Sequence, residues 1–247
     1  MLGVVGDVHG SVRTLEKLLN RLIGNYNIHR FIFLGDIINK GDHSKEVCDM
    51  IIDLKSNYDT TLILGNHEDV LNDYLHMSLR YGKDKFMKLG GEKTINSFTN
   101  RRFALEIAQK KDISLFVGKY FEAYEHFFES AVISESVEYK ELKFHFSHAG
   151  VGKEDSLKPL RNELWSKTTD RRDSPYFGYI SVHGHTPVNK IDTDLNSSKP
   201  YINKNKKGEV CSINLDTGCV YGHYLSAMVI DDNADYIFES IKFKDKN

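Results

Sequence analysis

Six short apolar runs, each ending in small or polar residues, place the strongest constraint on how this chain folds. The runs occupy residues 2–7, 30–36, 60–68, 142–150, 179–185 and 211–218. Uninterrupted apolar runs of this length are typical of strands that are buried on both faces. They predict a sheet that is covered by helices or by a second sheet.

Two amphipathic helical patterns separate the first three runs. Apolar residues recur at helical spacing over 11–23 and 43–55, and Ser11 is a residue type that caps helices. Strands that alternate with helices predict parallel pairing through right-handed crossovers. The sequence therefore predicts an α/β fold.

The rest of the chain has three further patterns. A long helical pattern over approximately 69–129 predicts a helical insert, or cap, over the sheet edge. The last third alternates strands with turns and ends in a predicted antiparallel hairpin whose turn lies near 231–235. Residues 196–208 have the composition of a flexible basic loop. The length of 247 residues suits a single domain, 1–247, that contains an insertion.

Composition argues against several classes of partner. The 33 basic and 35 acidic residues give a formal net charge of −2, so no global field draws the protein to a nucleic acid duplex or a membrane surface. No apolar run approaches the roughly 18 residues that a membrane span requires. The 3 cysteines lack CxxC spacing and argue against a disulfide framework. We therefore expect a cytoplasmic protein that binds neither nucleic acid duplexes nor membranes.

Polar side chains gather where the apolar runs end. Ligands of open α/β sheets bind beyond the carboxyl ends of the strands, so we expect these side chains to lie at one rim. A mixed set of nitrogen and oxygen donors suits Mn, Fe or Zn, and this set is too large for one tetrahedral ion. It predicts two metal ions that share a carboxylate. The residues are Asp7, His9, Asp36, Asn66, His67, His148, His183 and His185.

Turn chemistry is the alternative explanation for each Gly-Asp pair taken alone. It does not explain the ordered series GDVHG, GDIINKG, GNHE, HAG and GHTP along one chain. This series resembles that of the calcineurin-like metallophosphoesterases. The stretches NLDTGCVYG and LGGEKTINSF further resemble short bacterial and phage members of the serine/threonine protein phosphatase branch, which is related to the symmetrical diadenosine tetraphosphatases. The resemblance implies a four-layer fold, with a central β-sandwich flanked by helices and a dimetal centre at one rim.

The resemblance also implies a role for each donor. Asp7, His9 and Asp36 would hold the first metal ion, and Asp36 would bridge to the second. Two divalent ions are expected, Mn²⁺ first, with Fe or Zn as alternatives. A metal-bridging hydroxide would attack phosphorus directly, and His67 would protonate the leaving oxygen. The other ligands of the second ion would be Asn66, His148 and His185.

Three positions depart from the family pattern. Asn39 and Lys40 stand where the family has Asp and Arg, and Lys167 stands where it has Arg. Asn39 can orient His67 by a hydrogen bond but cannot supply charge. Lysine still meets phosphate, with less geometric restraint than a guanidinium group.

Further residues complete the predicted site. Lys40, Lys167 and Asn66 are the expected contacts of substrate phosphate, and His223 is a candidate contact at the rim. His183 competes with His185 as a ligand, and the Gly-His-Thr-Pro match favours His185.

Three functions are compatible with these residues. The first is a metal-dependent hydrolase of phosphomonoesters on proteins or small molecules, similar to the serine/threonine protein phosphatases. The second is a symmetrical bis(5'-nucleosyl)-tetraphosphatase or another nucleotide hydrolase. The third is a binding scaffold that has kept the fold and lost catalysis. The expected partner is a phosphorylated protein, a small phosphoester or a nucleotide.

Overall fold

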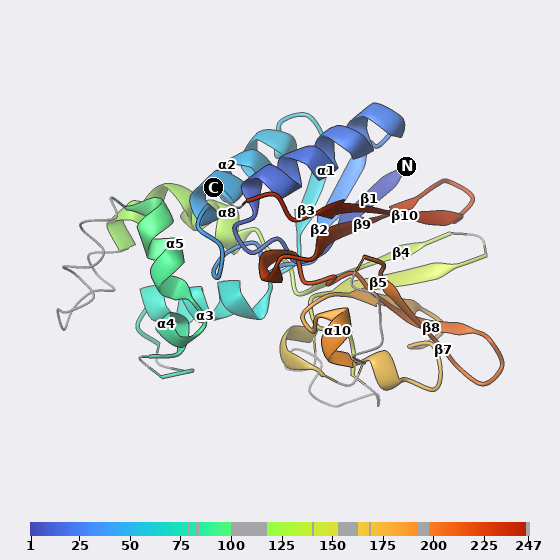
Figure 1. Cartoon of the computed structure of the whole chain (residues 1–247). Coiled ribbons are helices and arrows are strands. Elements are labelled where there is room, and N and C mark those ends of the chain that lie inside the picture. The colour runs from blue at the N-terminus through green and yellow to red at the C-terminus, as the bar shows by residue number, and fades with distance from the viewer. Residues whose placement is uncertain are drawn as a thin grey trace.

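Two five-stranded mixed sheets, stacked face to face, form the centre of this computed structural model (Figure 1). The structure describes residues 1–78, 80–82, 84–99, 118–139, 141–152, 163–167, 169–191 and 198–245. Helices flank the stacked sheets, as Figure 1 shows. The predicted α/β fold with a central β-sandwich is confirmed.

The first sheet has the strand order β10-β9-β1-β2-β3. Its strands are β1 (Leu2–Val5), β2 (Arg30–Phe33), β3 (Asp59–Leu62), β9 (Tyr224–Ile230) and β10 (Tyr236–Lys242). β1, β2 and β3 pair in parallel, whereas β9 and β10 form an antiparallel hairpin. Helices α1 (Val12–Asn25) and α2 (Ser44–Lys55) make the two crossovers, so the predicted βαβαβ unit is present.

The second sheet has the strand order β4-β5-β6-β8-β7. Its strands are β4 (Ser134–Glu138), β5 (Lys143–Ser147), β6 (Ile180–His183), β7 (Tyr201–Lys204) and β8 (Val210–Asn214). The three central strands are parallel and the two edge strands are antiparallel to their neighbours. The prediction of a flexible loop over 196–208 is wrong at β7, because pairing with β8 orders a polar sequence.

Alternation along the strands separates two apolar cores. Val4 of β1 and Ile32 of β2 face the second sheet, where they meet Phe146. Val5 and Phe33 point the other way, into the core beneath α1 and α2. Residues two apart on a strand share a face, so each strand serves both cores. β1 is therefore buried along its whole length and β2 over Phe31–Phe33, as their sequences predict, whereas β3 is buried only at Leu62.

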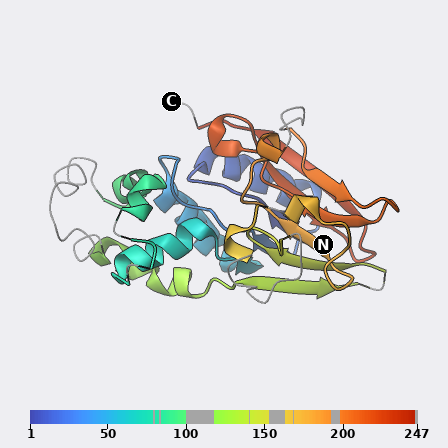
Figure 2. The same cartoon turned by 90° about the horizontal axis from the view of Figure 1, so that it is seen from below.

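Short helices cluster beyond one end of the sheets, at the left of Figure 1 and again in Figure 2. They are α3 (Asn66–Leu75), α4 (Lys85–Lys88), α5 (Gly91–Phe98), η1 (Glu122–Tyr124) and α8 (Glu125–Glu129). The predicted insert over 69–129 falls here, and its residues 100–117 lie outside the described part. α3 begins at Asn66, three residues before the predicted insert, so the GNHE motif forms its first turn.

The remaining short helices lie near the second sheet and the rim. They are η2 (Thr169–Arg171), α10 (Val188–Ile191) and η3 (Cys219–Tyr221). Within the described ranges, every helix is too short or too polar to cross a membrane.

Candidate metal centre

The segments that leave the strands bring the predicted donors together from both sheets. Asp36 follows β2, and its side chain lies between donors of the first and second sheets. His185 is partly buried, and the other donors are at most 4% exposed. The remaining positions are Asp7 and His9 after β1, Asn66 and His67 at the start of α3, His148 after β5 and His185 after β6.

Several of these positions adopt a left-handed backbone. The φ angles are +47° at His9, +50° at Asp36 and +72° at His185, a region that costs energy for residues other than glycine. Gly65 permits a close approach, since a Cβ there would lie 2.3 Å from the backbone nitrogen of Asp36. Such backbone strain persists only where the surroundings over-determine it, and it is common at functional sites.

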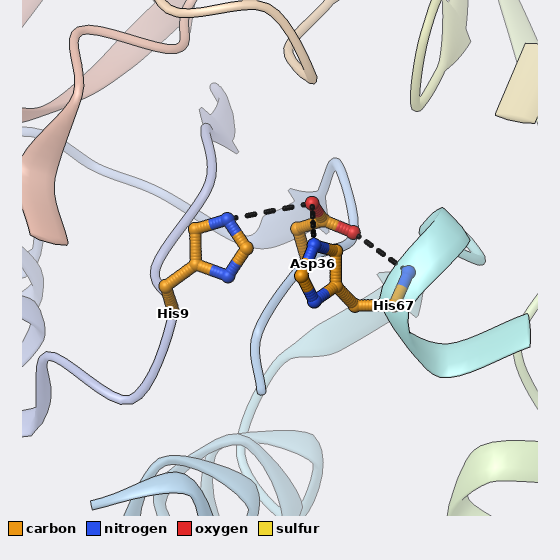
Figure 3. A group of neighbouring side chains, drawn as sticks. All are labelled: His9, Asp36 and His67. Atoms are coloured by element: carbon orange, nitrogen blue, oxygen red, sulfur yellow. Dashed lines mark hydrogen bonds and ion pairs between the residues drawn. The ribbon is translucent and has the colours of Figure 1, made fainter. Parts of the chain in front are cut away.

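The first donor group contains His9, Asp36 and His67 (Figure 3). Nε2 of His9 lies 3.4 Å and Nε2 of His67 lies 3.7 Å from Oδ2 of Asp36. The backbone N–H of His67 donates to Oδ1 of Asp36 at 3.1 Å. Nδ1 of His9 donates to the carbonyl of Ile38 at 2.8 Å, so its Nε2 carries the lone pair that faces Asp36.

The second donor group contains Asp36, His148 and His185, with Asn66 beside them. Nδ1 of His148 donates to the carbonyl of Leu34 at 2.8 Å, which leaves a lone pair on Nε2. That Nε2 lies 2.9 Å from Oδ1 of Asn66 and 3.3 Å from Oδ1 of Asp36. Nδ1 of His185 is also 2.9 Å from Oδ1 of Asn66. Acceptor atoms that converge in this way fit a cation among them.

The pKa values of the buried groups suit metal binding. Burial lowers the pKa of His148 to about 3 and that of His185 to about 2, so both rings are neutral at pH 7 and keep their lone pairs. Burial raises the pKa of Asp36 to about 6, although Lys40 lowers it. A divalent cation favours the ionised carboxylate, so the donor set fits two ions that share Asp36.

Asp7 lies beside the two compact groups and not within them. Its carboxylate accepts from the backbone N–H of His185 at 3.1 Å, and burial followed by repulsion from Asp216 raises its pKa. Asp216 is a buried carboxylate that the list of predicted site residues lacks. It follows β8 in the stretch NLDTG, at the same strand-exit position as Asp7 and Asp36, and that position was the available signal.

Glu68 is a second residue of this region that the sequence analysis did not identify. It is fully buried, and its carboxylate accepts from the backbone N–H groups of Asp36 at 2.8 Å, Ile37 at 3.0 Å and Gly65 at 3.0 Å. Burial raises the pKa of Glu68 to about 8. Glu68 therefore fixes the loop that presents Asp36, and its place as the fourth residue of GNHE was the available signal.

Thr94 fixes the side-chain amide of Asn39. The backbone N–H of Asn39 donates to Oγ1 of Thr94 at 2.9 Å, and the Thr94 hydroxyl donates to Oδ1 of Asn39 at 2.6 Å. The amide NH₂ of Asn39 therefore faces Nδ1 of His67, 2.9 Å away. Because an NH₂ group only donates, Nδ1 accepts this bond and neutral His67 carries its proton on Nε2.

The predicted phosphate-binding lysines lie at two sides of the donor groups. Nζ of Lys40 donates to Nε2 of His9 at 2.7 Å. Burial lowers the pKa of Lys40, but neighbouring carboxylates, Asp36 first, outweigh burial and raise it above its ordinary value. Lys167 is exposed and close enough to His185 to contribute to the lowered pKa of that ring.

The two other candidate histidines lie outside the donor groups. Nε2 of His183 lies 3.3 Å from Oδ1 of Asp170. His223 is half-buried, and its Nε2 lies 3.3 Å from Nδ2 of Asn189.

Comparison with known proteins agrees with this geometry. The profile of the calcineurin-like phosphoesterases matches residues 2–227. The chain is 26% identical over 252 residues to the asymmetrical bis(5'-nucleosyl)-tetraphosphatase PrpE of Halalkalibacterium halodurans, covering 91% of this chain and 88% of that protein. It is 31% identical over 114 residues to the symmetrical bis(5'-nucleosyl)-tetraphosphatase of Proteus mirabilis, covering 44% and 41%.

A solved structure gives the same fold. The serine/threonine phosphatase of Saccharomyces cerevisiae with similarity to human PP5 superposes with a TM-score of 0.56 at 14% identity, covering 100% of this chain and 81% of that chain. The family profile spans nearly all of the two sheets and every donor described above. The chain thus belongs to the calcineurin-like phosphoesterases, and it is a metal-dependent hydrolase.

Proposed function

We propose that the donors around Asp36 would hold two divalent metal ions. Asp7, His9 and Asp36 would hold the first ion. Asp36, Asn66, His148 and His185 would hold the second. The converging acceptor atoms around Asp36 are the observation that carries this assignment, and Asp7 is added from its place beside these groups and from the family motif. The mixed nitrogen and oxygen donors suit Mn²⁺, with Fe or Zn as alternatives.

The chain's own side chains complete the phosphoryl-transfer site. When bound, a pair of such ions lowers the pKa of water and neutralises charge on the phosphoryl oxygens. Lys40, Lys167 and Asn66 bind phosphate oxygens and orient the substrate. The Nε2–H of His67 donates a hydrogen bond to the leaving oxygen, where negative charge develops, and Asn39 holds the ring in that tautomer.

We propose a dinucleoside tetraphosphate as the substrate class. A relative that aligns over nearly the whole chain is an asymmetrical tetraphosphatase, which supports this choice. Water adds to one phosphorus, and the bond to the bridging oxygen breaks with release of a nucleotide. That leaving group is much less basic than the alkoxide of serine or threonine. A neutral His67 paired with Asn39 therefore suits a phosphoanhydride better than a phosphoserine.

The test compares three substrates on protein reconstituted with Mn²⁺. Diadenosine tetraphosphate, a phosphoserine peptide and p-nitrophenyl phosphate are assayed side by side, and nucleotide products are separated by chromatography. We expect the highest kcat/KM on the dinucleotide, with ATP and AMP as products. Two ADP molecules would favour symmetrical cleavage. Faster cleavage of the phosphopeptide would favour the phosphatase alternative, and no turnover of any substrate would favour the scaffold.

A further inference from the structure

An exposed aromatic ring borders the first donor group. Tyr221 is 55% exposed, and Nζ of Lys40 lies 5.5 Å from its ring centroid. The same Nζ lies 2.7 Å from Nε2 of His9. The ammonium group of Lys40, which would bind phosphate, therefore lies between the Tyr221 ring and the predicted metal ligand His9.

A tightly bonded turn presents this ring. Tyr221 ends η3, and two glycines with left-handed backbones, Gly218 (φ +72°) and Gly222 (φ +90°), lie on either side of that helix. The N–H of Gly218 donates to Oδ1 of Asp216 at 3.0 Å, and Cys219 is only 2% exposed. Because Cys219 packs in the core, the turn has a fixed position, and this position leaves the Tyr221 ring exposed.

Gly218 lets two rings approach the backbone of the turn. A Cβ at this position would lie 3.2 Å from Cδ2 of His223, which is a tight contact, and 3.7 Å from Cδ2 of Tyr221. Both rings therefore lie beside Gly218. The Nε2 of His223 lies 3.3 Å from the side-chain amide of Asn189. The rim thus combines an exposed aromatic face with groups that can donate and accept hydrogen bonds.

We propose that Tyr221 and His223 form a subsite for one nucleobase of the substrate, next to the phosphate bound at Lys40. This inference rests on the proposed function and names how the substrate is selected. Aromatic rings stack on any base, because every base presents a π face. His223 and Asn189 supply polar contacts at the edge of the base. Tyr221 is then a specificity-determining residue, because it contacts a part of the substrate that a simple phosphate ester lacks.

The experiment uses the full chain reconstituted with Mn²⁺ and a substitution that removes the ring. Tyr221→Leu is compared with Tyr221→Trp, which keeps an aromatic face, and with Phe177→Leu. Phe177 is 73% exposed and precedes β6, whereas the donors follow the other end of that strand. KM is measured for diadenosine tetraphosphate and for p-nitrophenyl phosphate. Binding of a methylene-bridged, uncleavable diadenosine tetraphosphate analogue is measured by calorimetry.

We expect Tyr221→Leu to raise the ratio of the dinucleotide KM to the p-nitrophenyl phosphate KM about 5- to 150-fold, the loss of one stacking contact. Analogue binding should weaken by a similar factor. Tyr221→Trp should retain both values, and Phe177→Leu should change neither. An unchanged ratio and unchanged analogue binding in Tyr221→Leu, with dinucleotide turnover intact, would overturn the subsite alone.

A wild-type protein that cleaves p-nitrophenyl phosphate but no dinucleotide would overturn the proposed function. Analogue binding then decides the subsite by itself. Weaker binding to Tyr221→Leu than to Phe177→Leu would support it, and equal binding to both would reject it.

Discussion

Burial sets the protonation of the side chains around Asp36. Removal from water lowers the pKa of His148 to about 3 and raises the pKa of Asp36 to about 6. Both changes favour the neutral form of the group. An imidazole must be neutral to bind a metal ion, whereas a carboxylate is ionised by the ion itself. The same burial therefore prepares both kinds of ligand for a divalent cation at neutral pH.

His67→Gln tests the bond from His67 to the leaving oxygen. Glutamine keeps a polar side chain but offers no imidazole N–H to the leaving oxygen, so we expect kcat for diadenosine tetraphosphate to fall about 10²- to 10³-fold. The fall for a phosphoserine peptide should be larger, because its alkoxide leaving group is far more basic. Steady-state kinetics on both substrates measure the difference. The exposed His76→Gln is the matched control, and equal losses on both substrates in His67→Gln would argue against a bond to the leaving oxygen.

The sequence predicts which polar side chains gather at the rim, but not the contacts that orient them. Asp36 and His185 follow apolar runs, so their shared rim is predictable from strand order. The contact between Thr94 and Asn39 joins residues 55 positions apart, and no local pattern encodes it. That contact sets the tautomer of His67, and it becomes visible only in three dimensions.

Glu68 connects helix α3 to the loop that follows strand β2. Glu68→Gln should lower the free energy of unfolding by about 1–3 kcal/mol, because an amide NH₂ cannot accept from the backbone N–H groups that the carboxylate now satisfies. Urea denaturation measures this change. Glu16→Gln, on the exposed face of α1, is the control. Equal stability of the two variants would show that Glu68 does not stabilise the loop.

The C-terminal segment caps α1 in place of a local residue. Ser11 makes no side-chain capping bond, whereas the carboxylate of Asp245 accepts from the N–H of Arg13 at 2.7 Å and of Thr14 at 3.2 Å. A carboxylate at a helix N-terminus also interacts favourably with the helix dipole.

Asp245→Ala should therefore destabilise the protein by about 0.5–2 kcal/mol. Thermal unfolding monitored by circular dichroism checks the change, with the exposed Asp232→Ala as reference. A loss in Asp245→Ala no larger than in the reference would show that the contact contributes nothing.

Strand prediction succeeded where both faces are buried and failed at the two edges of the second sheet. β1, β2 and β5 coincide with apolar runs because neighbours cover both of their faces. β4 and β7 are edge strands with polar sequences, and tertiary pairing orders them. These two strands lack the apolar signal, since one side of each meets solvent.

The candidate metal centre lies where residues from the two sheets meet. Asp7, His9 and Asp36 leave the first sheet, whereas His148 and His185 leave the second. Ions held by these groups would stabilise the folded chain by mass action. A free metal concentration of about 100 times Kd would contribute roughly 2.7 kcal/mol to the free energy of unfolding. Removal of metal by EDTA should therefore lower Tm by about 5 to 10 °C. Differential scanning calorimetry with and without Mn²⁺ measures the shift. An unchanged Tm would show that metal binding does not stabilise the two-sheet fold.

Anomalous diffraction from Mn²⁺-reconstituted crystals tests whether two ions share the Asp36 carboxylate. We predict two anomalous peaks per chain, both in contact with Asp36, one next to His9 and the other next to His148 and His185. A single peak, or two peaks that do not share Asp36, would show that this carboxylate does not bridge two ions.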